Sequence, residues 1–343
     1  MRAAGGSGAG PAALPVMTLG RSGVPVTALG FGAAAIGGLY EDVGEDDAAA
    51  AVEAAWDAGI RYFDTAPHYG LGLSERRLGA ALRTRPRDSF TLSTKVGRVL
   101  VQHDGGGDDR ANGFAVPATH RRRWDFSAAG VRRSLEDSLT RLGLDRVDLV
   151  LLHDPDDHED QAFREAYPAL EELRSQGVVR AIGAGMNQGR MLARFLADTD
   201  VDAVLCAGRY TLLEQGALDA LLPAAAAAGK SVIIGGVFNS GLLADPAPGA
   251  TYDYAAAPEE LLSRAVRLRG VTEAHGVPLR AAALRFPFGH PAVASVLVGA
   301  RSATQVRDAA AQYRRPVPSA VWEALQAQKL LPGGVPVPEG SGS

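Results

Sequence analysis

The chain has a single cysteine, no long hydrophobic run and no excess of positive charge. Cys206 alone can form neither an internal disulfide nor a cysteine-based zinc cluster, and its apolar neighbours predict a buried, unreactive thiol. No segment reaches the roughly 18 apolar residues that cross a bilayer, so we expect no membrane partner. The formal net charge of -4 argues against nucleic acid as a partner, and we interpret the arginines at 121–123 as a solvated loop.

Both ends of the chain are poor in core-forming residues. The segment 1–15 is rich in Gly, Ala, Ser and Pro, and it lacks the continuous apolar stretch of a signal peptide. The segment 331–343 has a similar composition. We therefore predict a single domain at 16–330 between flexible tails at 1–15 and 331–343, in a cytoplasmic protein.

Between these ends, strand-like and helix-like segments alternate. A hairpin is predicted before the first core strand, which we place near 27–32. The other strands are predicted at 60–65, 89–96, 146–153, 178–185, 201–207, 231–236 and 294–300. The helices are predicted at 46–59, 74–83, 127–143, 161–176, 188–197, 214–229, 258–275 and 304–312, with an extra one at 319–328.

Eight strand–helix pairs are typical of one α/β fold, the (β/α)8 TIM barrel, here with an N-terminal β-hairpin and an extra C-terminal helix. A doubly wound open sheet is the alternative. That fold requires a glycine-rich phosphate-binding turn after its first strand, and the segment GFGAAAIGG at 30–38 lacks the third glycine of the G-x-G-x-x-G motif. We therefore reject the open sheet.

Four polar residues stand at or just beyond the ends of predicted strands: Asp64, Tyr69, Lys95 and His153. In a βα-barrel, the carboxyl ends of the strands form the face where chemistry takes place. Taken singly, each residue has a structural explanation, as part of an ion pair, a packed aromatic or a rim histidine. Because they follow three adjacent strands, we expect their side chains to meet in one site.

This combination of side chains suits the interconversion of a carbonyl and an alcohol. Hydride addition to a carbonyl develops negative charge on oxygen, and a proton must be supplied to it. We assign that proton to Tyr69, whose pKa of ~10 the ammonium of Lys95 would lower. Asp64 would keep Lys95 charged and oriented. A neutral His153 would hydrogen-bond the substrate oxygen and orient it.

Two long loops, 97–126 and 237–257, follow predicted strands three and seven, and loops of that length commonly cover a site. We expect the first to form one wall of a substrate pocket. A metal site is an alternative, since HDPDDHED at 153–160 holds two histidines and five carboxylates. Catalytic metal ligands usually converge from several strands, whereas most of these acids share one loop, so we predict no metal.

The motifs FDTAPHYGLGLSERRLG, STKVG, LLHDPD and GMNQ, in this order, resemble the aldo-keto reductase family over about residues 17–330. In that family an Asp, a Tyr, a Lys and a His form the catalytic tetrad, and the match places it on the four residues named above. The resemblance implies a barrel that uses NAD or NADP without a Rossmann domain and ordinarily without metal. The segments AGRYTLLEQ and IIGGVFNSGLL are similar to the branch of aldose or L-fucose dehydrogenases and pyridoxal 4-dehydrogenase.

The resemblance also implies a set of cofactor residues. Asn187 matches the residue that holds the nicotinamide carboxamide. The segment 238–241 is similar to the loop over the pyrophosphate, and 299–310 resembles the segment at the adenosine end. The implied cofactor-binding residues are Asn187, Phe238, Asn239, Ser240, Gly241, Gly299, Arg301, Ser302 and Gln305.

Three positions depart from the family pattern. Met186 replaces a serine of the family, and Ala207 replaces a glutamine. Gly235 falls near the position where the family has the tyrosine that stacks on the nicotinamide. Phe238 is the candidate to compensate. Arg301 without a second basic residue at Gln305 indicates use of both dinucleotides or a preference for NAD.

The resemblance therefore implies an NAD(P)-dependent oxidoreductase that acts on a sugar-like hemiacetal, an alcohol or an aldehyde, with Tyr69 as proton donor and acceptor. A biosynthetic ketoreductase is one alternative. A non-catalytic regulatory protein that binds nicotinamide is another, and the intact tetrad argues against it.

Overall fold

The computed structural model describes residues 13–253 and 255–339. The parts of the predicted tails at 1–12 and 340–343 lie outside the described residues. Within that range, Leu331 and Val335 are buried in the main hydrophobic core. Packing against the core therefore continues past residue 330.

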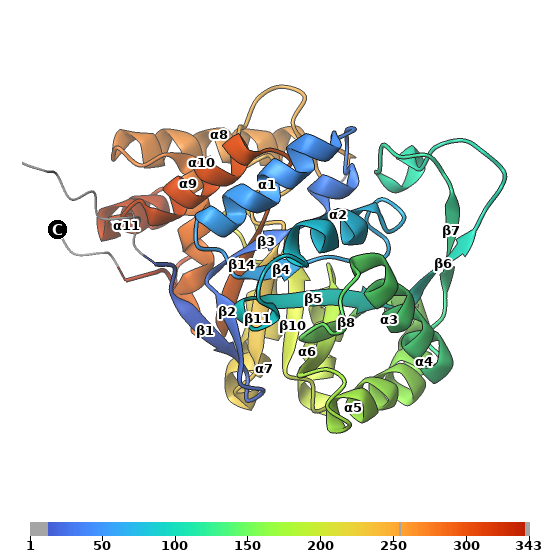
Figure 1. Cartoon of the computed structure of the whole chain (residues 1–343). Coiled ribbons are helices and arrows are strands. Elements are labelled where there is room, and N and C mark those ends of the chain that lie inside the picture. Colours follow the sequence, from blue (N-terminus) through green and yellow to red (C-terminus); the bar gives the residue numbers. More distant parts are fainter. Residues whose placement is uncertain (1–12, 254, 340–343) are drawn as a thin grey trace, which may run out of the picture.

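Eight parallel strands close into a barrel at the centre of the molecule (Figure 1). Each strand pairs with its neighbour in sequence order, and the last pairs with the first. This confirms the predicted (β/α)8 barrel. The strands are β3 (Leu29–Gly32), β4 (Tyr62–Asp64), β5 (Thr91–Val96), β8 (Leu149–His153), β9 (Ala181–Met186), β10 (Ala203–Ala207), β11 (Ser231–Gly235) and β14 (Val293–Gly299).

Helices surround the barrel, and the extra C-terminal helix is present as α11 (Figure 1). No helix in the described part of the chain is long and apolar enough to cross a bilayer. The helices are α1 (Glu45–Asp57), α2 (Leu73–Leu82), α3 (Ala128–Leu142), α4 (Glu159–Gln161), α5 (Tyr167–Ser175), α6 (Gly189–Asp198), α7 (Leu221–Ala228), α8 (Glu259–Ala274), α9 (Leu279–Arg285), α10 (Ala303–Arg314) and α11 (Ser319–Ala327).

Two predicted helices depart from a regular α-helix, each near a proline: one contains a π-helical turn and the other begins late. The helix predicted at 161–176 contains a π-helical turn at 162–166 before α5, whose second residue is Pro168. The helix predicted at 214–229 begins only at α7, which places Pro223 in its first turn. Proline has no N–H to donate to the preceding turn, so it is tolerated in the first turn of a helix but not in its interior.

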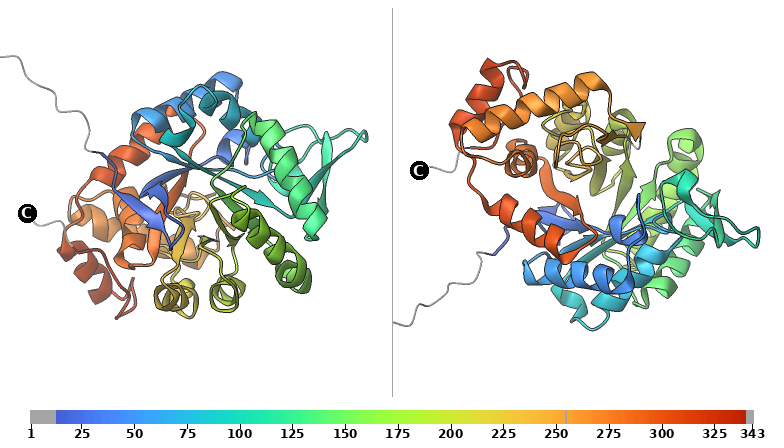
Figure 2. Two further views of the ribbon diagram at one scale, coloured as in Figure 1. Left: turned by 60° about the horizontal axis from the view of Figure 1, so that its bottom comes forward. Right: turned by 90° about the horizontal axis from the view of Figure 1, so that it is seen from above.

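Two hydrophobic layers hold the barrel together. One lies between the strands and the surrounding helices. The other fills the barrel interior, where Leu19, Val24 and Val26 pack beneath the inward-facing strand residues. These three residues belong to the predicted hairpin, formed by β1 (Val16–Leu19) and β2 (Val24–Thr27), which lies across the bottom of the barrel (Figure 2). The hairpin closes the amino-terminal end of the barrel and leaves the carboxyl ends of the strands for a site.

The predicted loop 97–126 contains an antiparallel hairpin, β6 (Arg98–Gln102) and β7 (His120–Trp124), which projects from the side of the barrel (Figures 1 and 2). Its connecting segment folds back onto the chain between β3 and α1. There the N–H of Tyr40 donates to the carbonyl of Gly113, and the N–H of Ala115 donates to Gly38, both at 2.8 Å. Among its described residues, the second long loop contains the short strand pair β12 (Thr251–Tyr252) and β13 (Ala255–Ala256).

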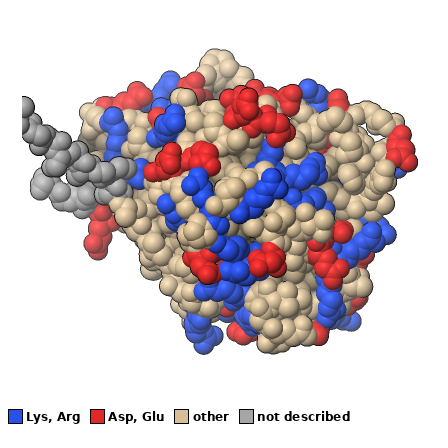
Figure 3. Space-filling view, in the orientation of Figure 1, with Lys and Arg blue, Asp and Glu red and all other residues tan. Residues whose placement is uncertain are grey.

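Charged side chains of both signs are intermixed on the surface. On the face shown in Figure 3, a band of Lys and Arg crosses the centre, with Asp and Glu on both sides of it. Several arginines of the described chain pair with carboxylates, for example Arg174 with Asp200 at 2.9 Å. Carboxylates therefore flank the basic band on this face.

Candidate active site

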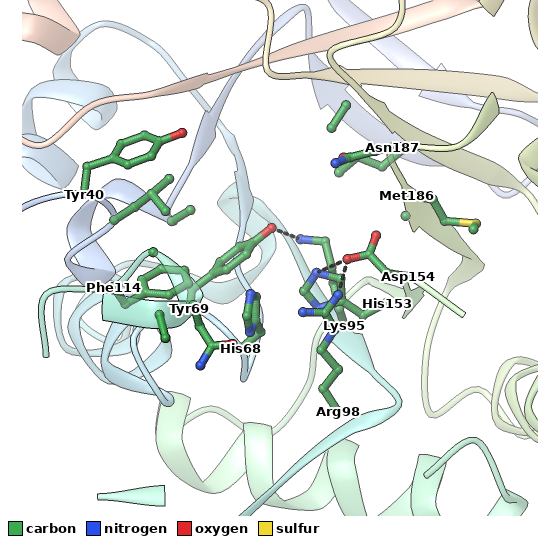
Figure 4. A pocket seen from close by; sticks show the side chains of 18 of the residues that line it. Tyr40, His68, Tyr69, Lys95, Arg98, Phe114, His153, Asp154, Met186 and Asn187 are labelled. Carbon is green, nitrogen blue, oxygen red and sulfur yellow. Dashed lines mark hydrogen bonds and ion pairs between the residues drawn. The ribbon is translucent and has the colours of Figure 1, made fainter. Parts of the chain in front are cut away.

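One cavity of about 610 Å³ lies at the carboxyl ends of the barrel strands, with lining residues from β5, β8, β9 and β10 (Figure 4). Asp64 ends β4, Lys95 is the penultimate residue of β5, and His153 ends β8. Tyr69 reaches the same cavity from the turn after β4. The cavity is lined by Ala34, Leu39, Tyr40, His68, Tyr69, Lys95, Arg98, Arg110, Ala111, Asn112, Gly113, Phe114, Ala115, His153, Asp154, Gly185, Met186, Asn187, Leu205 and Ala207.

A close approach of two glycines positions Tyr69. Gly70 has a φ of +61°, and a Cβ at this position would lie 2.1 Å from the carbonyl oxygen of Gly37. Only glycine accepts both the left-handed conformation and the contact. The turn after β4 therefore lies against the β3–α1 connection, and the phenol of Tyr69 points into the cavity (Figure 4).

A buried ion pair lies next to the Tyr69 hydroxyl. Lys95 Nζ donates to Asp64 Oδ2 at 2.6 Å and to Tyr69 Oη at 3.0 Å. The Ser93 hydroxyl donates to Asp64 Oδ1 at 2.8 Å and orients that carboxylate. Lys95 and Asp64 are 1 % and 2 % exposed, so water screens their interaction little. The geometry lets the ammonium stabilise the negative charge that forms when the phenol ionises.

The pKa of Lys95 is raised although burial opposes its charge, because the Asp64 carboxylate and the Tyr69 oxygen favour the ammonium. This agrees with the role expected for Asp64. The lowered pKa that we expected for Tyr69 is wrong. Burial raises the pKa of Tyr69, and the charge of Lys95 offsets this only in part. At neutral pH the phenol therefore holds its proton, which suits proton donation.

His153 is a neutral imidazole in the cavity. Burial, together with the positive charges of Arg98 and Lys95, holds its pKa well below the usual value. Its ring centroid is 5.7 Å from that of Tyr69. Within the described chain its buried Nδ1 has no hydrogen-bond partner. Its Nε2 is 3.7 Å from Asp154 Oδ2, too far for a hydrogen bond, so the protein does not select one tautomer.

Among the cofactor residues implied by the resemblance, Asn187 lines this cavity. Phe238, which we considered as a replacement for the stacking tyrosine, packs against the main core and does not line the cavity. The side chain of Asn239 is turned inward, accepting from the Thr211 hydroxyl at 2.7 Å and donating to the Gly208 carbonyl at 3.1 Å. Asn239, Ser240 and Gly241 all have positive φ and form a sharp turn after β11.

The remaining cofactor candidates gather where β14 meets α10. Gly299 ends β14, and the Ser302 hydroxyl accepts from the Gln305 N–H at 3.3 Å, which caps α10. Gln305 Oε1 accepts from the Arg301 N–H at 2.9 Å. The Arg301 guanidinium donates to the carboxylate of Glu41, from the β3–α1 connection. In (β/α)8 barrels, the loops after strands seven and eight frequently bind phosphate, and β11 and β14 hold those places here.

One wall of the cavity has the shape and the polar group that a nicotinamide ring with its carboxamide requires. Gly185, Leu205 and Ala207 present small or apolar surfaces, and the amide of Asn187 stands among them. Gly235, which stands near the place of the stacking tyrosine, lies behind Leu205 and Ala207 and does not line the cavity. The residues present therefore fit a nicotinamide, with Asn187 available to its carboxamide.

Several residues of the cavity were not singled out from the sequence. His68 and Asp154 immediately neighbour two predicted residues, and that adjacency was the available signal. The predicted loop 97–126 does form one wall, but its contribution to the lining includes Phe114 and not Trp124 or Phe126, which stack on each other. Long-range folding of this loop decides which of its aromatics reaches the cavity.

Two other kinds of reactive group were considered from the sequence, a free thiol and a set of metal ligands. Cys206 is buried and its pKa is raised to about 12 by burial, in agreement with the predicted unreactive thiol. In the described ranges, no three His, Cys, Asp or Glu side chains are placed to share a metal ion.

Comparison with known proteins identifies a family. The profile described as the Aldo/keto reductase family matches residues 28–329. D-threo-aldose 1-dehydrogenase from a Pseudomonas species is 47% identical over 317 residues, which cover 91% of this chain and 96% of that protein. Pyridoxal 4-dehydrogenase from Microbacterium luteolum is 40% identical over 332 residues, with coverage of 91% and 97%. Both belong to the branch that the sequence motifs indicated.

A solved structure agrees with this assignment. The holo form of an aldo-keto reductase from Bacillus halodurans superposes with a TM-score of 0.75 at 28% identity, covering 94% of this chain and 98% of that one. The similarity therefore extends over almost the whole barrel.

Proposed function

The chain belongs to the aldo/keto reductase family, and from this premise we propose that it oxidises aldoses at the anomeric carbon to lactones. Family membership makes it an NAD(P)-dependent oxidoreductase. An aldose is favoured over other substrates by the 47% identity to a D-threo-aldose 1-dehydrogenase and by the polar groups around the cavity. A cytoplasmic location remains a prediction from composition.

The observation that carries the proposal is the position of the Lys95 ammonium between a carboxylate and a phenol. Lys95 Nζ is 2.6 Å from Asp64 Oδ2 and 3.0 Å from Tyr69 Oη. A purely structural ion pair would not require a phenol as a third member that opens into a cavity. We infer that Tyr69 is the catalytic acid and base, with Lys95 and Asp64 acting through it.

Each of the four residues would have its own role in the reaction. During oxidation, Tyr69 accepts the proton of the substrate hydroxyl, and during reduction it returns a proton to the carbonyl oxygen. Lys95 stabilises the phenolate in the first case, and Asp64 keeps Lys95 charged. His153 donates a hydrogen bond to the same substrate oxygen and orients the reacting carbon. The dinucleotide, when bound, accepts or supplies the hydride.

Asn187 is the residue proposed to hold the nicotinamide end of the dinucleotide. The turn Phe238, Asn239, Ser240 and Gly241 is proposed to lie along the pyrophosphate. Gly299, Arg301, Ser302 and Gln305 are proposed to surround the adenosine. The N-terminus of α10 and the loops after β11 and β14 offer backbone N–H groups suited to phosphate.

A substrate screen tests the proposed function. The purified protein should oxidise at least one of L-fucose, D-arabinose and L-galactose with a kcat/KM about tenfold above that for pyridoxal. The absorbance of the reduced dinucleotide follows the rate, and the product should be a lactone. Oxidation of pyridoxal alone, or of none of these compounds, would contradict the proposal and favour another member of the branch or a ketoreductase.

The surroundings of Arg301 favour NAD over NADP. A 2′-phosphate beside Arg301 would also lie near the carboxylate of Glu41, which already accepts from this guanidinium. The two negative charges would repel each other. Replacing Glu41 by glutamine should therefore strengthen NADPH binding by about 5-fold, in keeping with the size of a partly exposed charge interaction, while NADH binding stays the same.

The dissociation constants can be measured by the fluorescence of the bound reduced dinucleotides, without any turnover. The matched variant Arg301→Gln should weaken NADPH binding and affect NADH little. Wild-type protein that binds NADPH as tightly as NADH would be inconsistent with this assignment of Glu41.

A further inference from the structure

One imidazole in the cavity has no part in the proton transfer described above. His68 lies in the turn after β4, and its ring meets those of Phe114 and His153 edge-on, with centroids 5.2 and 5.5 Å apart. Figure 4 shows it between these two rings, next to Tyr69. A histidine so close to the reacting groups can contact the substrate directly.

Arg122 holds one side of the His68 ring. The Nε of Arg122, from strand β7, donates to His68 Nδ1, and Nη2 donates to the His68 carbonyl oxygen at 2.9 Å. A guanidinium has only donors, so the Nδ1 that it meets must be the unprotonated nitrogen of the ring. In a neutral imidazole the proton is then on Nε2.

Asp109 in turn fixes Arg122. Its carboxylate accepts from Arg122 Nη1 at 2.7 Å and from Nη2 of the same guanidinium, and its side chain is 5 % exposed. Asn112 donates to Asp109 at 2.8 Å. This two-pronged pairing fixes the plane of the guanidinium, and with it the orientation of the His68 ring. Burial and the charges of Arg98 and Arg122 lower the pKa of His68 to about 2, so the imidazole is neutral.

The other ring nitrogen of His68, Nε2, is available for a ligand in the cavity. His68 is among the lining residues, and no group in the described part of the chain bonds to its Nε2. His153 differs, because no protein group selects its tautomer. The cavity therefore holds one imidazole that can adapt to the reacting oxygen and one that is preset as a donor at Nε2.

We propose that His68 Nε2 donates a hydrogen bond to a hydroxyl on the carbon next to the reacting carbon. Since the two imidazoles lie side by side in the cavity, with ring centroids 5.5 Å apart and planes at 78°, oxygens on adjacent carbons can meet one donor each. This deepens the proposed function and rests on it: the substrates selected are 2-hydroxy aldehydes and aldoses rather than simple aldehydes. Asp109 and Arg122 orient the His68 ring through hydrogen bonds, and of these three residues only His68 would contact the substrate.

Two substrates that differ in their hydroxyl groups test this role. Glyceraldehyde and propanal have the same carbon chain, and only glyceraldehyde carries a hydroxyl next to the carbonyl. For their NADH-dependent reduction, His68→Phe should lower kcat/KM for glyceraldehyde about tenfold, the size of one lost hydrogen bond, and leave propanal unchanged. His68→Gln keeps an N–H donor and should restore part of the preference. His158→Phe, a replacement outside the cavity, should change neither value.

The outcomes separate the two proposals. An equal loss for both aldehydes, or no loss for glyceraldehyde, would overturn the role of His68 while leaving the proposed function intact. Wild-type protein that reduces neither aldehyde and oxidises no aldose would instead remove the proposed function. Circular dichroism and the affinity for NADH, both expected to be unchanged in His68→Phe, establish that the variant is folded and binds the dinucleotide.

Discussion

Replacing Tyr69 by phenylalanine should lower kcat for aldose oxidation by about 10³-fold, within the range measured for general acid–base groups. The change removes one oxygen, the atom that Lys95 Nζ approaches to 3.0 Å, and keeps the ring that packs near Phe114 and His153. NADH affinity and KM should change little, since the hydroxyl is proposed to act in the chemical step. Steady-state kinetics and fluorescence titration with NADH measure the two parts separately.

The pH dependence supplies the control for Tyr69. Burial raises the pKa of this phenol, so the ionised form that accepts a proton grows as pH rises above neutrality. Wild-type oxidation should accordingly accelerate with pH, and the residual rate of Tyr69→Phe should lack that rise. A variant that retains normal turnover, or the wild-type pH profile, would exclude Tyr69 as the proton carrier.

Replacing Asp64 by asparagine should destabilise the fold by about 3–5 kcal/mol, because it leaves the Lys95 ammonium buried without its counter-charge. Lys95→Met should lower the free energy of unfolding by a similar amount, because it leaves the Asp64 carboxylate buried without its counter-charge. The pair is almost inaccessible to water, with side-chain exposures of 2% for Lys95 and 3% for Asp64. The free energy of unfolding in urea measures both effects.

The double variant Asp64→Asn with Lys95→Met separates stability from catalysis. It contains no unpaired buried charge, so its loss of stability should be well below the sum of the two single losses. Activity should remain lost in all three variants, since none retains a charged Lys95 held by a carboxylate. Asp137→Asn, at an exposed pair with Arg133, is the matched control and should change stability by no more than about 0.5 kcal/mol. Additive losses in the double variant would show that the two charges do not depend on each other.

The sequence alone was sufficient for the barrel and for the positions of three strand-end residues. Each core strand is a local apolar run, and a polar residue at its carboxyl end is visible without knowledge of any partner, as for Asp64 and His153. Parallel closure then brings adjacent strand ends together whatever the details of packing. The late start of α7, with Pro223 in its first turn, could also have been predicted locally, because it follows from the missing N–H of proline.

What the tertiary structure decided depends on residues distant in sequence. The tautomer of His68 is set by Arg122, 54 positions away, and the charge of Arg301 is balanced by Glu41, 260 positions away. The pKa of Tyr69 is likewise a balance between burial, which requires the folded cavity, and the charge of Lys95. Local pattern therefore determined which chemical groups stand at the mouth of the barrel. Only packing decided their protonation and orientation, because desolvation and long-range hydrogen bonds exist only once the chain has folded.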